Sequence, residues 1–391
     1  MLLIFILFIF FILHVQFLLR NIIWGTDEAT YFMFKISYLF DQSTSKKALI
    51  FTLLCAACFS IGYLFFYRRK KLPLDPVPVN IDWKRYRGEL LLLNISGLVQ
   101  VVYGIYLLLS SGFNYQIMAE EKMSNGFVFE LRIVYLIVLS HLLLNAPWSE
   151  LARKKELRWS RWILIAYVII SFLGQTRSVI FEIGAVVIIA QLLWQGDKFK
   201  FKYLLFMLAA MLVPNLIVLG RLGDLDDFGS LVKELFSFEY SVLYNNMLSG
   251  VIASGPTTSG GLSFMPSLLL IIPSPVRSLL GLSVVKSDFY SDLASSTGVT
   301  NGGFSLLAEM FANFGWFALL AFLSFGMLLG VFFKRAARVG KANFLGAAAP
   351  LLYVAFVLAF RNDFGVFVKY TIQLVILAAL LNTLMQTRLG K

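Results

Sequence analysis

The sequence predicts an all-α, polytopic membrane protein with about ten transmembrane helices and one large external loop. Hydrophobic residues make up 59% of the chain and charged residues only 14%, whereas soluble domains carry about 25% charged residues. The apolar residues form runs of roughly 20, the length that crosses the bilayer core. No stretch is long and polar enough to be a separate soluble domain, so residues 1–391 are expected to form a single integral membrane domain.

Ten apolar segments carry this prediction. The first has no basic residues before it and no small-residue cleavage site, so we interpret it as a retained helix and not as a cleaved signal. The fifth and sixth are short, and only Gln175-Thr176-Arg177 separates them, as in a tight helical hairpin. The predicted spans lie roughly at 1–19, 48–67, 89–110, 127–146, 161–175, 178–195, 203–220, 304–333, 343–360 and 364–385.

The basic residues orient these spans. Short cytoplasmic loops are enriched in Lys and Arg. With both termini in the cytoplasm, more than half of the 34 basic residues fall on the cytoplasmic side. The net charge of +12 then follows from topology. A nucleic-acid partner is not expected, because the basic clusters are divided among loops that adjoin membrane spans.

Residues 221–303 form the large external loop of this topology. The loop contains a turn-rich patch at 254–261 and an apolar run at 264–282 that three prolines interrupt. Prolines disfavour a straight spanning helix. We therefore expect this run to be partly helical and either to lie in the membrane interface or to dip into the membrane. Long ordered loops are usually functional.

Arginines at the external ends of spans are the most informative polar residues. Arg177 lies between spans five and six, Arg221 follows span seven, Arg361 lies between spans nine and ten, and Arg277 lies in the large loop. The enrichment of basic residues in cytoplasmic loops does not explain arginines at these external positions. A guanidinium presents a planar fork of donors that suits phosphate and carboxylate. We predict that Arg177, Arg221 and Arg361 converge on one external cavity; the alternative is that each snorkels or pairs with a nearby acid.

Acidic residues within spans supply candidate bases. Ser305, Glu309 and Asn313 are spaced four apart and are predicted to form one polar stripe at the start of span eight. An ionisable residue inside a span is costly and indicates function, although Glu309 is equally interpretable as a structural partner of an arginine. Glu182 in span six is a weaker candidate of the same kind. Three further carboxylates near the external side are fallback candidates: Asp224, Glu239 and Asp363.

Two other observations bear on chemistry. Glu130 and Arg132, near the start of span four, are interpreted as neutralising each other, and His14 and His141 are expected to pack in the core. The sequence has no phosphate-binding glycine loop, dinucleotide fingerprint or metal-ligand cluster. We therefore predict neither a metal nor another cofactor.

The layout resembles that of the Wzy-type O-antigen polymerases, a family of oligosaccharide repeat-unit polymerases. The resemblance covers nearly all of the chain and rests on the number of spans and on the late external loop. Four local patches contribute to it: Gly174-Gln175-Thr176-Arg177, Gly220-Arg221, the stretch from Gly302-Gly303 to Gly315, and Arg361-Asn362-Asp363.

This resemblance implies a membrane glycosyltransferase of the bacterial inner membrane that serves lipopolysaccharide or related surface-polysaccharide biosynthesis. Such enzymes transfer a growing glycan from undecaprenyl pyrophosphate to a new lipid-linked repeat unit at the periplasmic face. Glu309, Arg221 and Arg361 would be catalytic. The substrate-binding residues would be Arg177, Arg277, Asn313, Ser305, Asp224, Glu239 and Asp363. The implied partners are undecaprenyl-pyrophosphate-linked glycans, membrane lipids and a chain-length regulator protein.

Three alternatives remain open. A lipid-linked oligosaccharide flippase is disfavoured because the ionisable residues crowd the external end and do not line a pore along its length. An O-antigen ligase is disfavoured because the family relies on a histidine in the external loop, and residues 221–303 contain none. A membrane acyltransferase needs a histidine near an arginine in an early span, and His14 fits this poorly.

Overall fold

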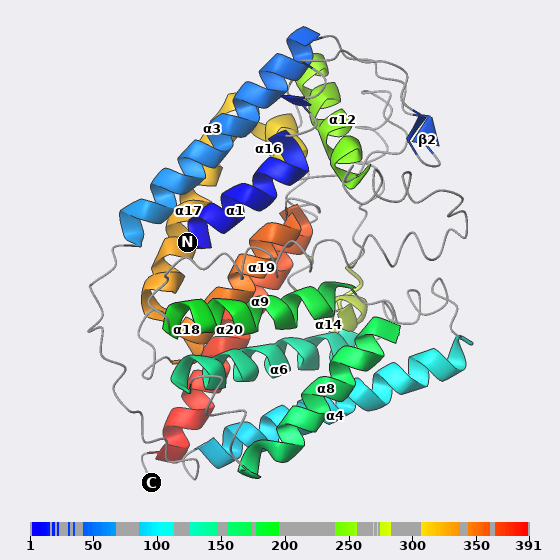
Figure 1. Ribbon diagram of the computed structural model, residues 1–391, viewed down its shortest axis with the longest axis vertical. Helices are drawn as coiled ribbons and strands as arrows, with labels where there is room; N and C mark the ends of the chain where they lie inside the picture. The colour runs from blue at the N-terminus through cyan, green and yellow to red at the C-terminus, as the bar shows by residue number, and fades with distance from the viewer. Residues whose placement is uncertain are drawn as a thin grey trace. The chain divides into compact units, whose positions relative to one another are not determined.

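The computed structural model is helical apart from one small hairpin in the part of the chain that it describes (Figure 1). In that hairpin, β1 (Thr30–Tyr31) pairs antiparallel with β2 (Phe34–Lys35). The chain divides into two compact units. The described residues are 2–15, 18–19, 22, 30–31, 34–35, 42–67, 86–112, 126–146, 155–173, 177–194, 239–255, 269, 272, 274–282, 306–336, 343–359 and 364–389.

Nine of the ten predicted spans coincide with helices, and the remaining one, 203–220, lies outside the described residues. The helices at these nine positions are α1 (Leu2–Phe10) with the π-helix η1 (Phe11–Val15), α3 (Gln42–Phe66), α4 (Arg87–Ser110), α6 (Gly126–Asn145), α8 (Arg158–Leu173) with the 3₁₀ turn η3 (Lys155–Leu157) before it, α9 (Arg177–Trp194), α16 (Leu306–Phe314) with α17 (Ala318–Ala336), α18 (Phe344–Ala347) with α19 (Ala349–Ala359), and α20 (Phe364–Leu389).

The apolar character of these helices indicates association with a membrane. Within the described residues, the helical segments Gln42–Phe66, Arg87–Ser110 and Leu306–Ala336 are long and apolar enough to cross a bilayer. Several shorter helices are also strongly apolar. Helix α4 exposes a row of large apolar side chains, as a lipid-facing surface does. This row comprises Leu91, Ile95, Leu98, Val102, Ile105 and Leu109.

Two of the predicted spans contain a π-helix or a 3₁₀ turn. In the first, the helix widens to a π-turn at Phe11–Val15. In the eighth, α16 ends at Gly315, whose φ of +54° is a left-handed conformation that glycine adopts without a Cβ penalty. A 3₁₀ turn, η4 (Gly315–Phe317), then connects α16 to α17. Neither break was predicted from the sequence.

Unit 1 comprises Met1–Phe66, Val218–Gly330 and Ala355–Ile372. Its centre includes α12 (Glu239–Ser254), a helix within the predicted external loop that the sequence analysis did not identify. Helix α12 packs against α3, α16 and η1 (Figure 1). A second, short helix of the loop, α14 (Ser274–Leu279), lies within the apolar run for which partly helical structure was predicted.

Helices α3 and α17 of unit 1 cross at two glycines. A Cβ added to Gly326 would overlap the carbonyl oxygen of Phe59 and lie 2.9 Å from the amide nitrogen of Tyr63. A Cβ added to Gly62 would overlap the carbonyl oxygen of Leu323. Small residues allow membrane helices to approach this closely. The two helices can therefore approach this closely only because these two positions are glycine.

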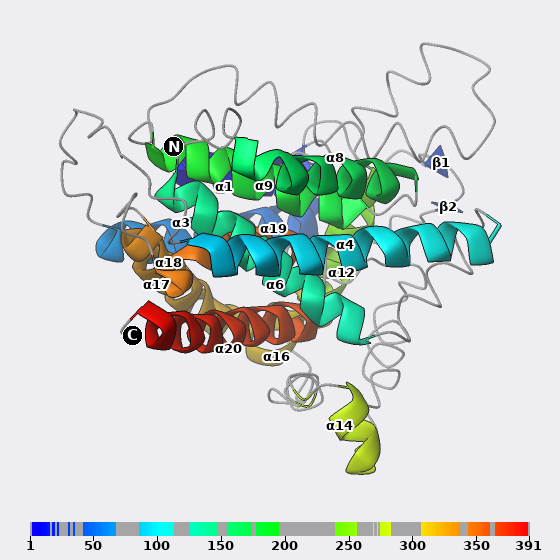
Figure 2. The ribbon, with the colours of Figure 1, turned by 90° about the horizontal axis from the view of Figure 1, so that it is seen from below.

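Unit 2 comprises Tyr67–Ile217, Val331–Val354 and Gln373–Lys391. Its helices α4 and α8 are parallel, because residue numbers rise along both helices from one contact between them to the next. Ser160 Oγ donates to Asn94 Oδ1 at 2.7 Å, and Tyr167 Oη donates to Gln100 Oε1 at 3.4 Å. Figure 2 shows α6 crossing α4 in the same group of helices.

Helix α6 runs antiparallel to α4. Near the start of α4, Glu89 pairs with His141 near the end of α6, with 2.8 Å between Oε2 and Nδ1. Further along α4, Gln100 Nε2 donates to the carbonyl oxygen of Val128 at 2.7 Å, close to the start of α6. Residue numbers therefore rise along α4 while they fall along α6.

Helix α9 is parallel to α6. Arg132 contacts Glu182 near the starts of the two helices, and Trp194 Nε1 donates to the carbonyl oxygen of Leu143 at 2.7 Å near their ends. Helices α4 and α8 thus run in one direction, and α6 and α9 in the other. Consecutive helices of this set therefore alternate in direction, as the predicted topology requires.

Candidate functional site

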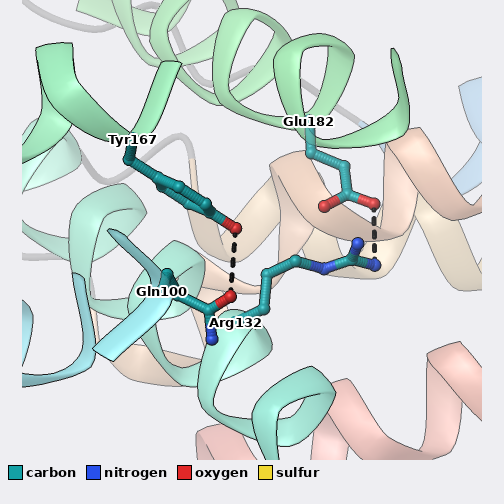
Figure 3. A network of polar contacts seen from close by, with 4 residues as sticks. All are labelled: Gln100, Arg132, Tyr167 and Glu182. Carbon is teal, nitrogen blue, oxygen red and sulfur yellow. Dashed lines mark hydrogen bonds and ion pairs between the residues drawn. The ribbon is translucent and has the colours of Figure 1, made fainter. Parts of the chain in front are cut away.

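A buried ion pair lies inside unit 2 between α6 and α9. Arg132 Nη2 is 3.3 Å from Glu182 Oε1 (Figure 3). The side chain of Glu182 is 1% exposed and that of Arg132 is 13% exposed. Removing a charge from water is expensive unless a partner compensates it. The buried carboxylate of Glu182 is therefore not expected to be tolerated without Arg132.

Polar side chains from α4 and α8 lie beside this pair. Figure 3 shows Tyr167 pointing at the amide of Gln100, with Arg132 extending past them toward Glu182. Tyr135 meets the ring of Tyr167 edge to face, with 5.5 Å between the ring centres. The Gln100 amide nitrogen donates to the backbone carbonyl oxygen of Val128. Tyr167 and Gln100 thus place polar groups on one side of the ion pair.

The second carboxylate oxygen of Glu182, Oε2, can accept a further hydrogen bond. Glu182 Oε2 is buried and has no hydrogen-bond partner among the described residues. A buried acceptor without a partner costs free energy in the resting protein. Such an atom is suited to accept a hydrogen bond from a hydroxyl group of a ligand.

The ion pair lies toward the end of unit 2 at which α6 and α9 begin. Arg177 is the first residue of α9, about one turn and a half before Glu182 along the helix. Arg132 and Arg177 both belong to this end of unit 2, and guanidinium groups suit anionic groups such as phosphate.

Neither Arg132 nor Glu182 was among the leading candidate site residues predicted from the sequence. Arg132 was predicted to neutralise Glu130, whose side chain lies outside the described part of the structure, so that prediction stays untested. The described partner is Glu182, on a different helix. A single sequence does not reveal which residue of a distant helix will pair with an arginine.

Glu309 lies in unit 1 on a helix that is buried on all sides. Every residue from Leu306 to Asn313 is buried, and Glu309 is 1% exposed. The amide of Asn313 donates to the carbonyl oxygen of Glu309 at 2.8 Å, so the two residues occupy successive turns, as predicted. Ser305, the third member of the predicted stripe, lies outside the described residues.

The other predicted site residues are placed in part. Arg277 is half-buried in α14, and Glu239 is the first residue of α12. Four further predicted site residues lie outside the described part of the chain: Arg221, Asp224, Arg361 and Asp363. The convergence of Arg177, Arg221 and Arg361 stays a prediction.

Both histidines are buried, as expected from their apolar surroundings. His14 lies in the π-turn η1 of unit 1 and is fully buried. His141 pairs with Glu89 and stacks on Phe344, with 4.1 Å between the ring centres and 11° between the ring planes. His141 therefore lies at the end of unit 2 away from the starts of α6 and α9.

Comparisons with known proteins identify no relative of this chain. No protein-family model, no curated protein and no solved structure matches it.

Proposed function

We propose that this protein polymerises lipid-linked oligosaccharide repeat units into a surface polysaccharide such as O-antigen, at the periplasmic face of a bacterial inner membrane. A hydroxyl group of the new repeat unit attacks the anomeric carbon of the growing glycan. The bond between that carbon and the pyrophosphate oxygen breaks, and undecaprenyl pyrophosphate leaves. The hydroxyl proton passes to a carboxylate of the protein.

The observation that carries this proposal is the Arg132–Glu182 pair near the starts of α6 and α9, with Arg177 beginning α9. The reaction needs positive charge for a pyrophosphate that becomes more negative as it departs, and guanidinium groups suit phosphate oxygens. It also needs an acceptor for a hydroxyl proton. Glu182 Oε2, which is buried and has no partner among the described residues, fits that need.

In this proposal the residues divide into two roles. Arg132 and Arg177 belong to the pyrophosphate side, together with Arg221 and Arg361 if these converge as predicted. Glu182 orients the acceptor hydroxyl within unit 2. Glu309 remains the carboxylate that the resemblance favours as the base, and the two candidates are separable by experiment.

A deletion strain tests the proposed reaction directly. We expect gel analysis of its surface polysaccharide to show the ladder of long chains collapse to core plus one repeat unit, because synthesis, export and ligation of single units continue without a polymerase. Complementation with the intact gene should restore the ladder. Loss of every repeat unit would contradict the proposal and indicate a ligase or a flippase instead.

Glu309→Gln tests the role of the buried carboxylate in α16. The substitution preserves shape and most hydrogen bonding but removes the charge, so a base at this position predicts normal protein levels with polymer formation reduced about 10²- to 10⁴-fold. Polymer yield per unit of membrane protein is the measurement. Glu309→Asp, which retains a carboxylate, is the control and should keep part of the activity.

Two outcomes would contradict that role for Glu309. Wild-type polymer from Glu309→Gln would show that the charge is not needed. Loss of the protein from the membrane would indicate that Glu309 is a structural partner within unit 1, as its burial also permits.

A further inference from the structure

Exposed basic and tryptophan side chains gather where α4 and α8 begin in unit 2. Arg87 is exposed at the first position of α4, and Lys155 and Arg158 are exposed at the start of α8. Trp159 and Trp162 are 75% and 57% exposed on the first turns of α8. We propose that these five residues, the α8 entry surface, bind the headgroup of an anionic phospholipid.

Contacts between the two helices bring this surface together. Asn94 on α4 accepts a hydrogen bond from Ser160 on α8, and both lie within the first turns of their helices. Because the helices are parallel, the first residue of α4 lies at the same end as the 3₁₀ turn that precedes α8. Arg87 therefore belongs to the same end of unit 2 as Lys155 and Arg158.

The parallel packing is held by two glycines one heptad apart. A Cβ on Gly97 would lie 2.6 Å from Ile163 Cγ2, and one on Gly104 would lie 2.5 Å from Ile170 Cγ2. Spacing by seven keeps the same faces in contact along both helices. The relative position of the two helix starts is thus defined by packing along their length.

The helix dipole does not explain the basic residues of this surface. The last turn of a helix favours cations, and Lys334 and Arg335 occupy the last turn of α17. Arg87 and Arg158 are instead the first residues of α4 and α8, where the dipole is unfavourable to a cation. Their exposed positive charges would gain from an external anion.

The acidic residue in the first turn of α4 does not supply that anion. Glu89, in the first turn of α4, is buried and pairs with His141 at 2.8 Å. Its carboxylate is directed into unit 2 and does not offset the charges of Arg87 and Arg158 at the surface. Glu156, in η3, is one acidic residue beside the three basic residues of this surface, so the surface carries net positive charge.

The two tryptophans select a lipid as the source of the anion. Tryptophan is enriched where the acyl chains of a bilayer meet the headgroups. Beyond Trp162, the exposed face of α8 continues through Ile165, Ile169 and Phe172, an apolar stripe suited to acyl chains. A phosphate at the level of Arg158 with acyl chains along this stripe satisfies both parts of the surface. This placement also assigns the end of unit 2 at which α4 and α8 begin to the cytoplasmic side of the membrane, where anionic headgroups attract basic residues.

The experiment measures lipid binding to the purified full-length protein in detergent. Phosphatidylglycerol is titrated, and the rise in melting temperature and the lipid retained in native mass spectra are recorded. Each basic residue near an anionic surface is worth about fivefold in binding. We therefore expect the double variant Arg87→Gln, Arg158→Gln to bind phosphatidylglycerol about 25-fold more weakly than wild type. Trp159→Ala with Trp162→Ala should also weaken retention.

Matched variants localise the effect. Lys334→Gln with Arg335→Gln removes the same charge from the last turn of α17, and Phe317→Ala removes an exposed aromatic ring from η4, outside the proposed surface; both should bind lipid nearly as wild type does. Equal weakening by the α17 pair would overturn the assignment to the α8 entry surface. Equal stabilisation by phosphatidylethanolamine or by inorganic phosphate would overturn an anionic lipid as the ligand. Undiminished binding to the Arg87, Arg158 variant would also refute the proposal.

Discussion

Gly326→Ala and Gly62→Ala are expected to destabilise the protein, although each adds a single methyl group. The added Cβ would overlap a backbone carbonyl oxygen of the facing helix, at Phe59 for Gly326 and at Leu323 for Gly62. A backbone atom has no rotamer by which to move away, so α3 and α17 must separate. Overpacking of this kind costs about 1–3 kcal/mol, and occasionally more. The melting temperature in detergent and the protein level in membranes are the measurements.

Gly184→Ala is the matched control for this substitution. Gly184 also lies within a helix, α9, but an added Cβ would meet nothing within 4 Å. Alanine is favoured over glycine in a helix by about 0.5–1 kcal/mol, so this variant should be neutral or slightly more stable. A wild-type melting temperature for both Gly62→Ala and Gly326→Ala would show that α3 and α17 do not approach as closely as described.

Replacing Arg132 and Glu182 is expected to separate stability from activity. Arg132→Met alone leaves the buried carboxylate of Glu182 without its guanidinium partner and should cost about 3–5 kcal/mol. The double variant removes both charges, and such replacements are often neutral or stabilising. We therefore expect Arg132→Met with Glu182→Leu to recover the melting temperature of the wild type. It should nevertheless form no polymer if the pair binds pyrophosphate and the acceptor hydroxyl.

The double variant is decisive because a purely structural ion pair predicts the opposite activity. Polymer of wild-type length from the recovered protein would show that Arg132 and Glu182 serve folding alone. Tyr167→Phe is the control for polarity near the pair. It removes only a 3.4 Å hydrogen bond to Gln100 and should change polymer yield much less.

Helix positions were predictable because they depend on a local property. Any segment that crosses a bilayer needs about 20 apolar residues, whichever helices surround it. The predicted span at 89–110 accordingly corresponds to α4, Arg87–Ser110, within two residues. Helix α12 escaped prediction because residues 239–254 include polar side chains such as Asn245 and Ser249. These are buried only because α12 packs among other helices of unit 1.

The candidate site shows the limit of the same reasoning. The sequence identified Glu309 and Asn313 as residues on one face of one helix, and their contact follows from a four-residue spacing. It did not identify Glu182 as the partner of Arg132, because that contact joins two helices separated by another helix in the chain. Periodicity assigns a side chain to a face of its own helix but contains no information about the helix that will meet that face.

The sequence by itself thus determined that this is an apolar, helical membrane protein, and where most of its helices lie. The tertiary structure alone decided which polar groups meet. Helix length and apolarity are set by contact with lipid, residue by residue. The Arg132–Glu182 pair, the α3–α17 glycine crossing and the α8 entry surface are set by the register between helices, which close packing of side chains determines.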